Sequence, residues 1–154
     1  MIEIRPATIE DIPRLVTISA EAVVELNYCP PELFDVNKVI LTYNLAVESN
    51  EQEVLLAFDG VDVVGFLFGV SYLQWYSSER VACELALYIS PKYRGRHLLK
   101  RLLNEYYKWA KYTAHATKVT LGVSVETDRQ RTETMFELLG LKKGNQVFEL
   151  NGEI

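Results

Sequence analysis

Cysteine, histidine and long apolar runs are scarce in this sequence. The two cysteines, Cys29 and Cys83, stand too far apart to suggest a metal site or a disulfide framework, and they favour a reducing, cytoplasmic setting. The two histidines have no cysteine or histidine partner at metal-ligand spacing, so we expect no metal. The longest apolar-rich run, residues 61–73, is interrupted by aspartate, glycine and serine, which predicts a buried strand rather than a membrane span.

The sequence also lacks an excess of basic residues and any sign of a boundary between domains. The formal net charge of −5 argues against nucleic acid as the main partner. Residues 1–5 lack the charged-then-apolar layout of a signal peptide, and no linker, repeat or low-complexity tract divides the chain. We therefore expect one domain over residues 1–154, large enough to bury a core, with no membrane association.

What the sequence does contain is an ordered series of apolar patterns. They predict elements in the order β-α-α-β-β-β-α-β-α-β. The predicted strands are residues 2–5, 53–58, 63–73, 81–90, 118–126 and 146–151, and the predicted helices are residues 8–27, 35–47, 98–113 and 127–139. We expect an α/β fold whose mixed sheet combines antiparallel strands with one central parallel pair, residues 81–90 and 118–126, and flanking helices.

Residues 93–103, Tyr-Arg-Gly-Arg-His-Leu-Leu-Lys-Arg-Leu-Leu, join a predicted strand to a predicted helix. The first N–H groups of that helix have no partner and lie at the positive end of its dipole, where they can hold an anion. Ligands of such sheets also bind at the carboxyl ends of the parallel strands. The same place gathers the basic side chains of Lys92, Arg94, Arg96, His97 and Lys100. Two interpretations follow: a site for a phosphate-bearing ligand, or a solvated helix start with ordinary surface charges.

The element order and this turn together resemble the GNAT family of acyl-CoA N-acyltransferases over nearly the whole chain. The resemblance rests on the opening Ile-Arg-Pro, the Asp59-Gly60 hairpin, the run Glu-Leu-Ala-Leu-Tyr-Ile-Ser-Pro into Tyr-Arg-Gly, and Gly140-Leu141 after the last helix. The family's turn is written Gln/Arg-x-x-Gly-x-Gly/Ala. Arg94 fills its first position and Gly95 follows, but two expected glycine positions are occupied by His97 and Leu99.

This resemblance implies acetyl-CoA as the acyl donor. Its pantetheine arm would pair with main-chain groups of Leu87, Tyr88 and Ile89. Its pyrophosphate would lie on the turn and the helix start, held by Arg94, Gly95, Arg96, His97, Leu98 and Lys100. A side chain at position 97 narrows this cradle, while its imidazole N–H offers a phosphate oxygen a further donor.

The resemblance also implies direct attack of an amine on the thioester, with Glu84 as the base. Alternation along the strand predicts that Glu84 shares a face with Ala82, Ala86 and Tyr88. The alternative for Glu84 is a surface glutamate in a salt bridge. Glu126, at the end of the following strand, is a second candidate base with the same alternative.

The general acid departs from the family pattern. Relatives carry a tyrosine in the last helix where this sequence has Phe136, which we interpret as a core residue, and an asparagine where it has Arg129. The remaining proton donors are water, Tyr88, Cys83 and Ser124. The sequence does not choose among these donors, and we take Tyr88 as the candidate catalytic residue.

Three aromatic residues, Tyr72, Trp75 and Tyr76, cluster on the hairpin before the strand of Glu84. They predict either an apolar wall of the acceptor-substrate site or packing over the open face of the sheet. If Trp75 is exposed, it also favours a homodimer.

We therefore expect an N-acetyltransferase that moves an acetyl group from acetyl-CoA to a primary amine of a small molecule or a protein. The departures at His97, Leu99, Phe136 and Arg129 support an alternative, a catalytically weak or inactive GNAT-fold protein that binds coenzyme A or a protein partner. A toxin-like enzyme acting on charged tRNA is a third hypothesis, which the acidic net charge disfavours.

Overall fold

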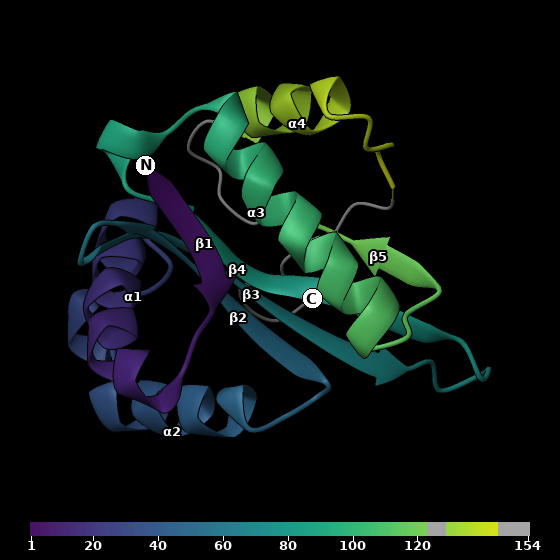
Figure 1. The fold of residues 1–154 in the computed structure, drawn as a ribbon, viewed down its shortest axis with the longest axis horizontal. Coiled ribbons are helices and arrows are strands. Elements are labelled where there is room, and N and C mark those ends of the chain that lie inside the picture. Colours follow the sequence, from purple (N-terminus) through teal and green to yellow (C-terminus); the bar gives the residue numbers. More distant parts are fainter. Residues whose placement is uncertain (123–128, 145–154) are drawn as a thin grey trace, which may run out of the picture.

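A twisted sheet crosses the molecule, with helices on both of its faces (Figure 1). The structure is a computed structural model that describes residues 1–122 and 129–144. Its strands are β1 (Ile2–Pro6), β2 (Gln52–Asp59), β3 (Asp62–Leu73), β4 (Arg80–Ile89) and β5 (Lys118–Thr120). Its helices are α1 (Ile12–Leu26), α2 (Val36–Val47), α3 (Arg96–Lys108), continued by a π-helical turn (Trp109–Thr113), and α4 (Arg129–Leu138).

The strand order is β1-β2-β3-β4-β5, in which the first four strands are antiparallel and β4 and β5 are parallel. The predicted α/β fold, with antiparallel strands and one parallel pair, is therefore confirmed. The predicted strand over residues 146–151 and the second half of the one over residues 118–126 lie outside the described residues. None of the helices in the described ranges is long and apolar enough to cross a membrane.

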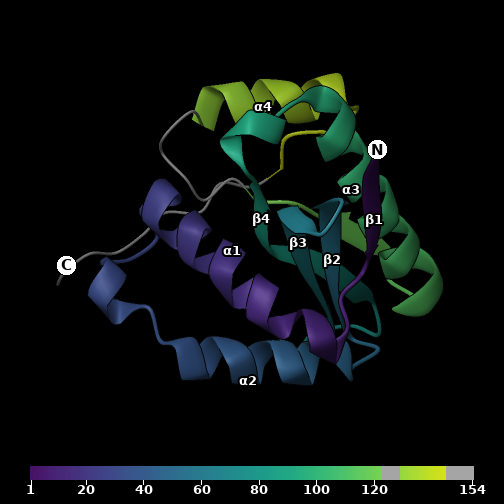
Figure 2. The ribbon, with the colours of Figure 1, turned by 60° about the vertical axis from the view of Figure 1, so that its left-hand side comes forward.

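The helices α1 and α2 cover one face of the sheet, and α3 and α4 cover the other (Figure 2). A hydrophobic core lies on each of these faces. The core under α1 and α2 is built around Leu15, Tyr43, Leu56, Phe66 and Phe68. The core under α3 is built around Leu55, Leu67, Leu102, Tyr106 and Trp109. Burial of each such large side chain contributes about 1.5–3 kcal/mol. Alternate residues of β2 and β3 point into these two cores, which is the pattern of a strand covered on both faces.

Two helix boundaries differ from the predictions. The segment Ile9–Asp11 forms a 3-10 turn in which the buried Asp11 accepts hydrogen bonds from Thr8 and Arg5, so α1 begins only at Ile12. By contrast, α3 begins at Arg96, earlier than the predicted start at Leu98. The first two residues of α3, Arg96 and His97, are polar, and the apolar periodicity on which the prediction rested begins after them.

Candidate active site

In the described part of the chain, the parallel strands β4 and β5 form the edge of the sheet and separate after three paired positions. Their pairing runs from Val81 opposite Lys118 to Cys83 opposite Thr120 and, within the described residues, goes no further. Glu84 is the first residue of β4 beyond this point, and its carboxylate accepts a hydrogen bond from the backbone N–H of Gly122 at 2.9 Å. A side chain therefore spans the gap where main-chain pairing stops. Among the described residues no strand pairs with this side of β4 beyond this fork, so its main-chain groups there are available to a ligand.

A β-bulge in β4 corrects the prediction that Glu84 and Tyr88 share a face. Pairing with β3 shifts from Gly69 opposite Glu84 to Phe68 opposite Ala86, so Leu85 is an extra residue. Directly paired residues point to the same face of a sheet. The α3 face therefore carries Glu84 and Ala82, and the α1 face carries Ala86 and Tyr88. The two candidate catalytic side chains lie on opposite faces of one strand.

The carboxyl of Glu84 has the electrostatic character of a proton acceptor. Burial raises the pKa of Glu84 above its usual range, although the hydrogen bond from Gly122 works in the other direction. Among the described residues no basic side chain forms an ion pair with Glu84, so the salt-bridge alternative does not hold for this part of the chain. A half-buried carboxyl with a raised pKa at the end of a strand pairing is a candidate functional group.

The turn from β4 to α3 has the form of an anion site. A 3-10 turn (Pro91–Tyr93) leads to Gly95 as the N-cap of α3, and no side chain in the described ranges caps the helix. The first N–H groups of α3 are therefore open. The first helical bond is donated by the N–H of Leu99 to the carbonyl of Gly95, at 3.3 Å, so Lys100 lies beyond the open set and can contribute only its ammonium group.

Nothing within the fold requires a glycine at position 95. Its φ of 173° is extended backbone that any residue adopts, and an added Cβ would meet no protein atom within 4 Å. The space next to Gly95 is thus open at the point where the helix N–H groups begin. This is the free approach that a pyrophosphate on the turn needs. The side chain of His97 is exposed next to this open space, which fits an imidazole at the border of the pyrophosphate site.

The side chain of Arg94 lies away from the helix start. Its Nε donates to the carbonyl oxygen of Ile89 at 2.9 Å, and its guanidinium forms an ion pair with Glu25 of α1. The guanidinium also lies 5.8 Å from the ring centre of Tyr88. Arg94 therefore braces the turn against α1, and only its main chain stays near the expected phosphate position.

Tyr88 belongs to the same cluster. Its hydroxyl donates to Oε2 of Glu25 at 2.6 Å, and its ring is buried under α1. Burial and the hydrogen bond to Glu25 raise the pKa of Tyr88 to about 12. Sequence reasoning missed Glu25, although one local signal was present: an acidic residue in the last turn of a helix is unfavourable next to the helix dipole.

Several other predicted residues can also be placed. Phe136 is buried in the core under α3, which confirms the interpretation of a core residue. Of the other candidates, Ser124 and Glu126 lie outside the described residues. The hairpin aromatics are exposed at 46% for Tyr72, 91% for Trp75 and 64% for Tyr76, so they do not pack over the sheet.

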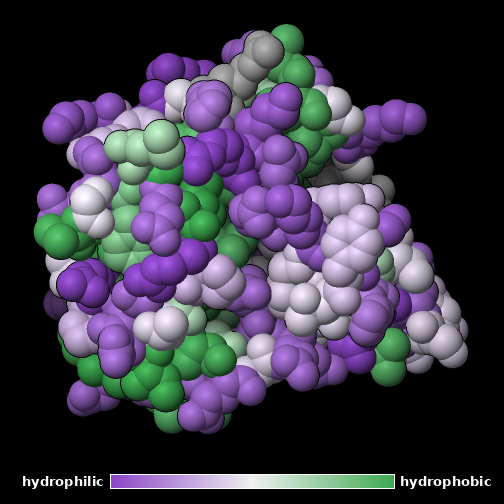
Figure 3. All heavy atoms as spheres, viewed as in Figure 1, coloured by the Kyte–Doolittle hydropathy of each residue, from purple (hydrophilic) through white to green (hydrophobic). Residues whose placement is uncertain are grey.

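Exposed apolar side chains also occur on α2, along the lower left of the molecule in the space-filling view (Figure 3). The most exposed of these are Leu41 and Leu45. In the described part of the chain, no group of three histidine, cysteine, aspartate or glutamate side chains is arranged to hold a metal ion.

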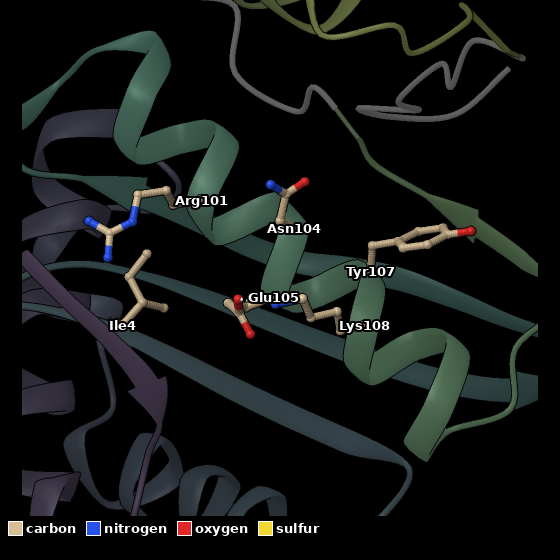
Figure 4. A pocket seen from close by; sticks show the side chains of 6 residues that line it. All are labelled: Ile4, Arg101, Asn104, Glu105, Tyr107 and Lys108. Carbon is tan, nitrogen blue, oxygen red and sulfur yellow. Dashed lines mark hydrogen bonds and ion pairs between the residues drawn. The ribbon is translucent and has the colours of Figure 1, made fainter.

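A pocket of about 270 Å³ lies away from the turn, between β1 and the side of α3 (Figure 4). It is lined by Ile4, Arg101, Asn104, Glu105, Tyr107 and Lys108. Its charges are already used within the protein, because Lys108 pairs with Glu105 at 2.7 Å and Arg101 donates to the carbonyl of Ile2 at 2.9 Å. We assign this pocket no part in the reaction.

The family model described as the acetyltransferase (GNAT) family matches residues 20–141 of the 154-residue chain. The chain belongs to the GNAT acetyltransferase family, as this match over most of its length shows. The resemblance inferred from the turn and the element order is confirmed. No curated protein sequence matches the chain.

Solved structures show the same fold over whole chains. AAC(6')-Iy, in complex with the bisubstrate analog CoA-S-monomethyl-acetylneamine, is 13% identical with a TM-score of 0.78, covering 100% of this chain and 99% of that one. A predicted acetyltransferase with acetyl-CoA from Clostridium acetobutylicum is 19% identical with a TM-score of 0.72, covering 98% and 96%. Ribosomal-protein-alanine N-acetyltransferase from Brucella melitensis biovar Abortus 2308 is 14% identical with a TM-score of 0.72, covering 99% and 100%. At these identities the likeness establishes the fold.

Proposed function

We propose that this GNAT protein is an N-acetyltransferase that moves an acetyl group from acetyl-CoA to a primary amine of a small molecule or a protein. One observation carries the proposal: the fork between β4 and β5 holds a carboxyl group with a raised pKa, Glu84, on the strand that leads to an open, uncapped helix start. The first feature suits removal of a proton, and the second suits a pyrophosphate. A reducing, cytoplasmic setting is part of the proposal, and the two cysteines are free.

The residues at the turn fit coenzyme A. The N–H groups of Arg96, His97 and Leu98 supply donors at the positive end of α3, next to the open space at Gly95. The exposed Lys100, together with Lys92, adds positive charge. Main-chain groups of β4 at Leu87, Tyr88 and Ile89 lie beyond the fork, where we propose that the pantetheine arm pairs with them. Acetyl-CoA supplies the acetyl group as an activated thioester.

Glu84 is proposed to accept the proton that the attacking amine loses, directly or through water. As the new N–C bond forms and the C–S bond breaks, the carboxylate takes up one proton and the thiolate receives another. The raised pKa strengthens Glu84 as a base. The bulge at Leu85 interrupts the regular ladder with β3 next to this position, and a main-chain N–H of the bulge is the proposed donor to the thioester oxygen.

For the proton that the thiolate receives, the structure favours water over Tyr88. The hydroxyl of Tyr88 is already donated to Glu25, its pKa is raised to about 12, and it faces away from Glu84. An acid with that pKa gives up its proton less readily than an ordinary tyrosine. Tyr88 as the general acid stays a prediction, which the kinetics of Tyr88→Phe can test.

A second function is a GNAT-fold protein that binds coenzyme A without catalysis. The observation that favours it is Phe136, which is buried and has no proton to give where relatives carry a tyrosine. The two functions differ in turnover and agree in binding.

Two measurements on the purified protein test the proposal. Calorimetric titration with acetyl-CoA should show binding, and thiol release with a panel of amines should exceed the rate without protein. The panel includes aminoglycosides and peptides with a free N-terminal amine, because solved structures of the fold include AAC(6')-Iy and a ribosomal-protein-alanine N-acetyltransferase. Absence of heat at millimolar acetyl-CoA contradicts both functions. Binding without turnover of any amine supports the second.

A further inference from the structure

The C-terminal turn of α1 is fastened to the end of β4 and to the turn that follows it. Glu25 lies in that last turn of α1, where the helix has no basic residue and where a negative charge is unfavourable next to the helix dipole. A residue that breaks a local preference in this way usually has a compensating tertiary role. The contacts of Glu25 show what that role is.

Both carboxylate oxygens of Glu25 are engaged with residues far away in the sequence. Oε2 accepts the hydroxyl proton of Tyr88 at 2.6 Å, and Oε1 pairs with the guanidinium of Arg94. The Arg94 side chain continues the connection through its Nε, which donates to the carbonyl of Ile89 at 2.9 Å. The carboxylate is only 32% exposed, and the hydrogen bonds from Tyr88 and Arg94 outweigh burial and lower its pKa. Glu25 is therefore an ionised, fully used acceptor and is unsuited to removing a proton.

The turn itself is anchored from two sides. On one side the hydroxyl of Tyr93 donates to Asp59 at the end of β2, at 2.9 Å. On the other side stands the ion pair between Arg94 and Glu25. Gly95 and the open N–H groups of α3 come immediately after these two anchors, so the direction in which the N–H groups point depends on both of them.

We propose that Glu25 is a positioning residue for the acetyl-CoA turn: by holding Arg94 and Tyr88 it fixes the path of residues 90–95 and thereby the direction of the N–H groups at the start of α3. This inference rests on the proposed function for its ligand, and on the free structure for the positioning itself. Glu25 acts through Arg94 and touches neither the amine nor the thioester. Its loss should therefore weaken acetyl-CoA binding and leave the chemical step nearly unchanged.

Three variants separate this role from a general effect of charge. Glu25→Ala removes both contacts, and Glu25→Gln keeps an oxygen for one of them. Glu21→Gln is the matched control, because Glu21 lies one turn earlier on α1 and acts on Tyr88 through its charge alone, with no hydrogen bond or ion pair among the described residues. Circular dichroism and thermal unfolding establish that each variant is folded.

The first readout needs no ligand. Amide hydrogen exchange of the free protein should speed up in Glu25→Ala at the hydrogen-bonded N–H groups of the turn, those of Tyr93, Arg94 and Leu99, and stay as in the wild type in Glu21→Gln. Unchanged exchange at these three N–H groups in Glu25→Ala overturns the inference. This readout decides the matter even if the wild type binds no acetyl-CoA, in which case it is the proposed function that fails.

The second readout is the effect on the cofactor. Calorimetry should give a Kd for acetyl-CoA roughly tenfold weaker in Glu25→Ala, as expected for loss of about one charge-assisted hydrogen bond, with a smaller loss in Glu25→Gln. The KM for acetyl-CoA should rise in parallel, while kcat stays within about threefold. A fall in kcat with an unchanged KM contradicts a positioning role, and so does an equal loss of affinity in Glu21→Gln.

Discussion

Two glutamates near the end of β4 lie on opposite faces of the sheet and have opposite electrostatic environments. On the α3 face, Glu84 is half-buried, its one hydrogen-bond partner among the described residues is the backbone N–H of Gly122, and its pKa is raised. On the α1 face, Glu25 receives a hydroxyl and a guanidinium, and its pKa is lowered. The same functional group is thus suited to accepting a proton in one place and is held by two partners in the other. What separates them is the supply of cationic and donor partners.

The bulge at Leu85 creates this division. In a regular strand, Glu84 and Tyr88 would point to the same face, and Tyr88 would lie on the α3 face with Glu84. With one extra residue, Tyr88 is turned to α1 and to Glu25, and Glu84 stays at the fork with β5. The comparison of the two faces can be tested by changing one side at a time.

The largest expected effect follows from Glu84→Gln. The amide cannot accept the proton of the amine, so kcat should fall by roughly two to four orders of magnitude. Gln keeps an oxygen for the N–H of Gly122, so the Kd for acetyl-CoA should remain within about twofold. The measurement is steady-state kinetics with an amine that turns over, alongside calorimetry. An unchanged kcat would show that the base is another residue.

Alanine substitutions at two glycines, Gly69 and Gly95, separate an effect of packing on stability from an effect on acetyl-CoA binding. At Gly69 a Cβ would lie 2.5 Å from Cε2 of Tyr106, so Gly69→Ala should lower the free energy of unfolding by about 1–3 kcal/mol. At Gly95 a Cβ meets no protein atom, so Gly95→Ala should leave stability unchanged and weaken acetyl-CoA binding by roughly tenfold. Urea unfolding and calorimetry check the two variants. Normal affinity in Gly95→Ala would contradict a pyrophosphate site next to this residue.

The burial of a carboxyl group on this face should also make the free energy of unfolding depend on pH. Glu53 of β2 pairs with the same Gly69 as Glu84 does, and burial raises the pKa of Glu53 to about 7. The pKa of Glu53 is higher in the folded protein than in the unfolded chain. Its contribution to the free energy of unfolding is therefore present below a pH of about 4.5 and is lost as the pH rises to about 7. Glu53→Gln should remove this loss. The variant should be more stable than the wild type at pH 8 by roughly 1–2 kcal/mol, allowing for partial exposure. Equal stability of the two proteins from pH 4 to pH 8 would contradict the shift.

The smallest effect is expected on the α1 face from Tyr88→Phe. The substitution removes one hydrogen bond to Glu25 and should cost about 1 kcal/mol of stability. Arg94 still holds Glu25 in this variant, so kcat should change by less than about threefold. If kcat instead falls by about a hundredfold or more, Tyr88 is the general acid.

Local patterns predicted the element order well, because apolar spacing and the Asp59-Gly60 turn report directly on helices, strands and hairpins. The open helix start could also be anticipated from the element order and the basic turn. The bulge could not, because residues 81–89 contain no glycine or proline to mark it and its position depends on pairing with β3. A single domain over residues 1–154 stays a prediction.

The role of Glu25 could not be predicted for a related reason. Its partners, Tyr88 and Arg94, are more than sixty residues away along the chain, and only the packing of α1 on the sheet brings them together. The same holds for the direction of the Arg94 side chain. The motif position indicated a place near the phosphates, and the ion pair with α1 turns the guanidinium elsewhere.

The most direct test of the contrast between the two faces is a site-specific NMR titration of the side-chain carboxyl carbons of Glu84 and Glu25 in the free protein, assigned with Glu84→Gln and Glu25→Gln. We predict that Glu84 titrates above the ordinary glutamate value of about 4.3 and that Glu25 titrates below it. The result needs neither cofactor nor acceptor substrate. A pKa of Glu84 at or below that value, or a pKa of Glu25 at or above it, would contradict the assignment of the base to one face and of the anchor to the other.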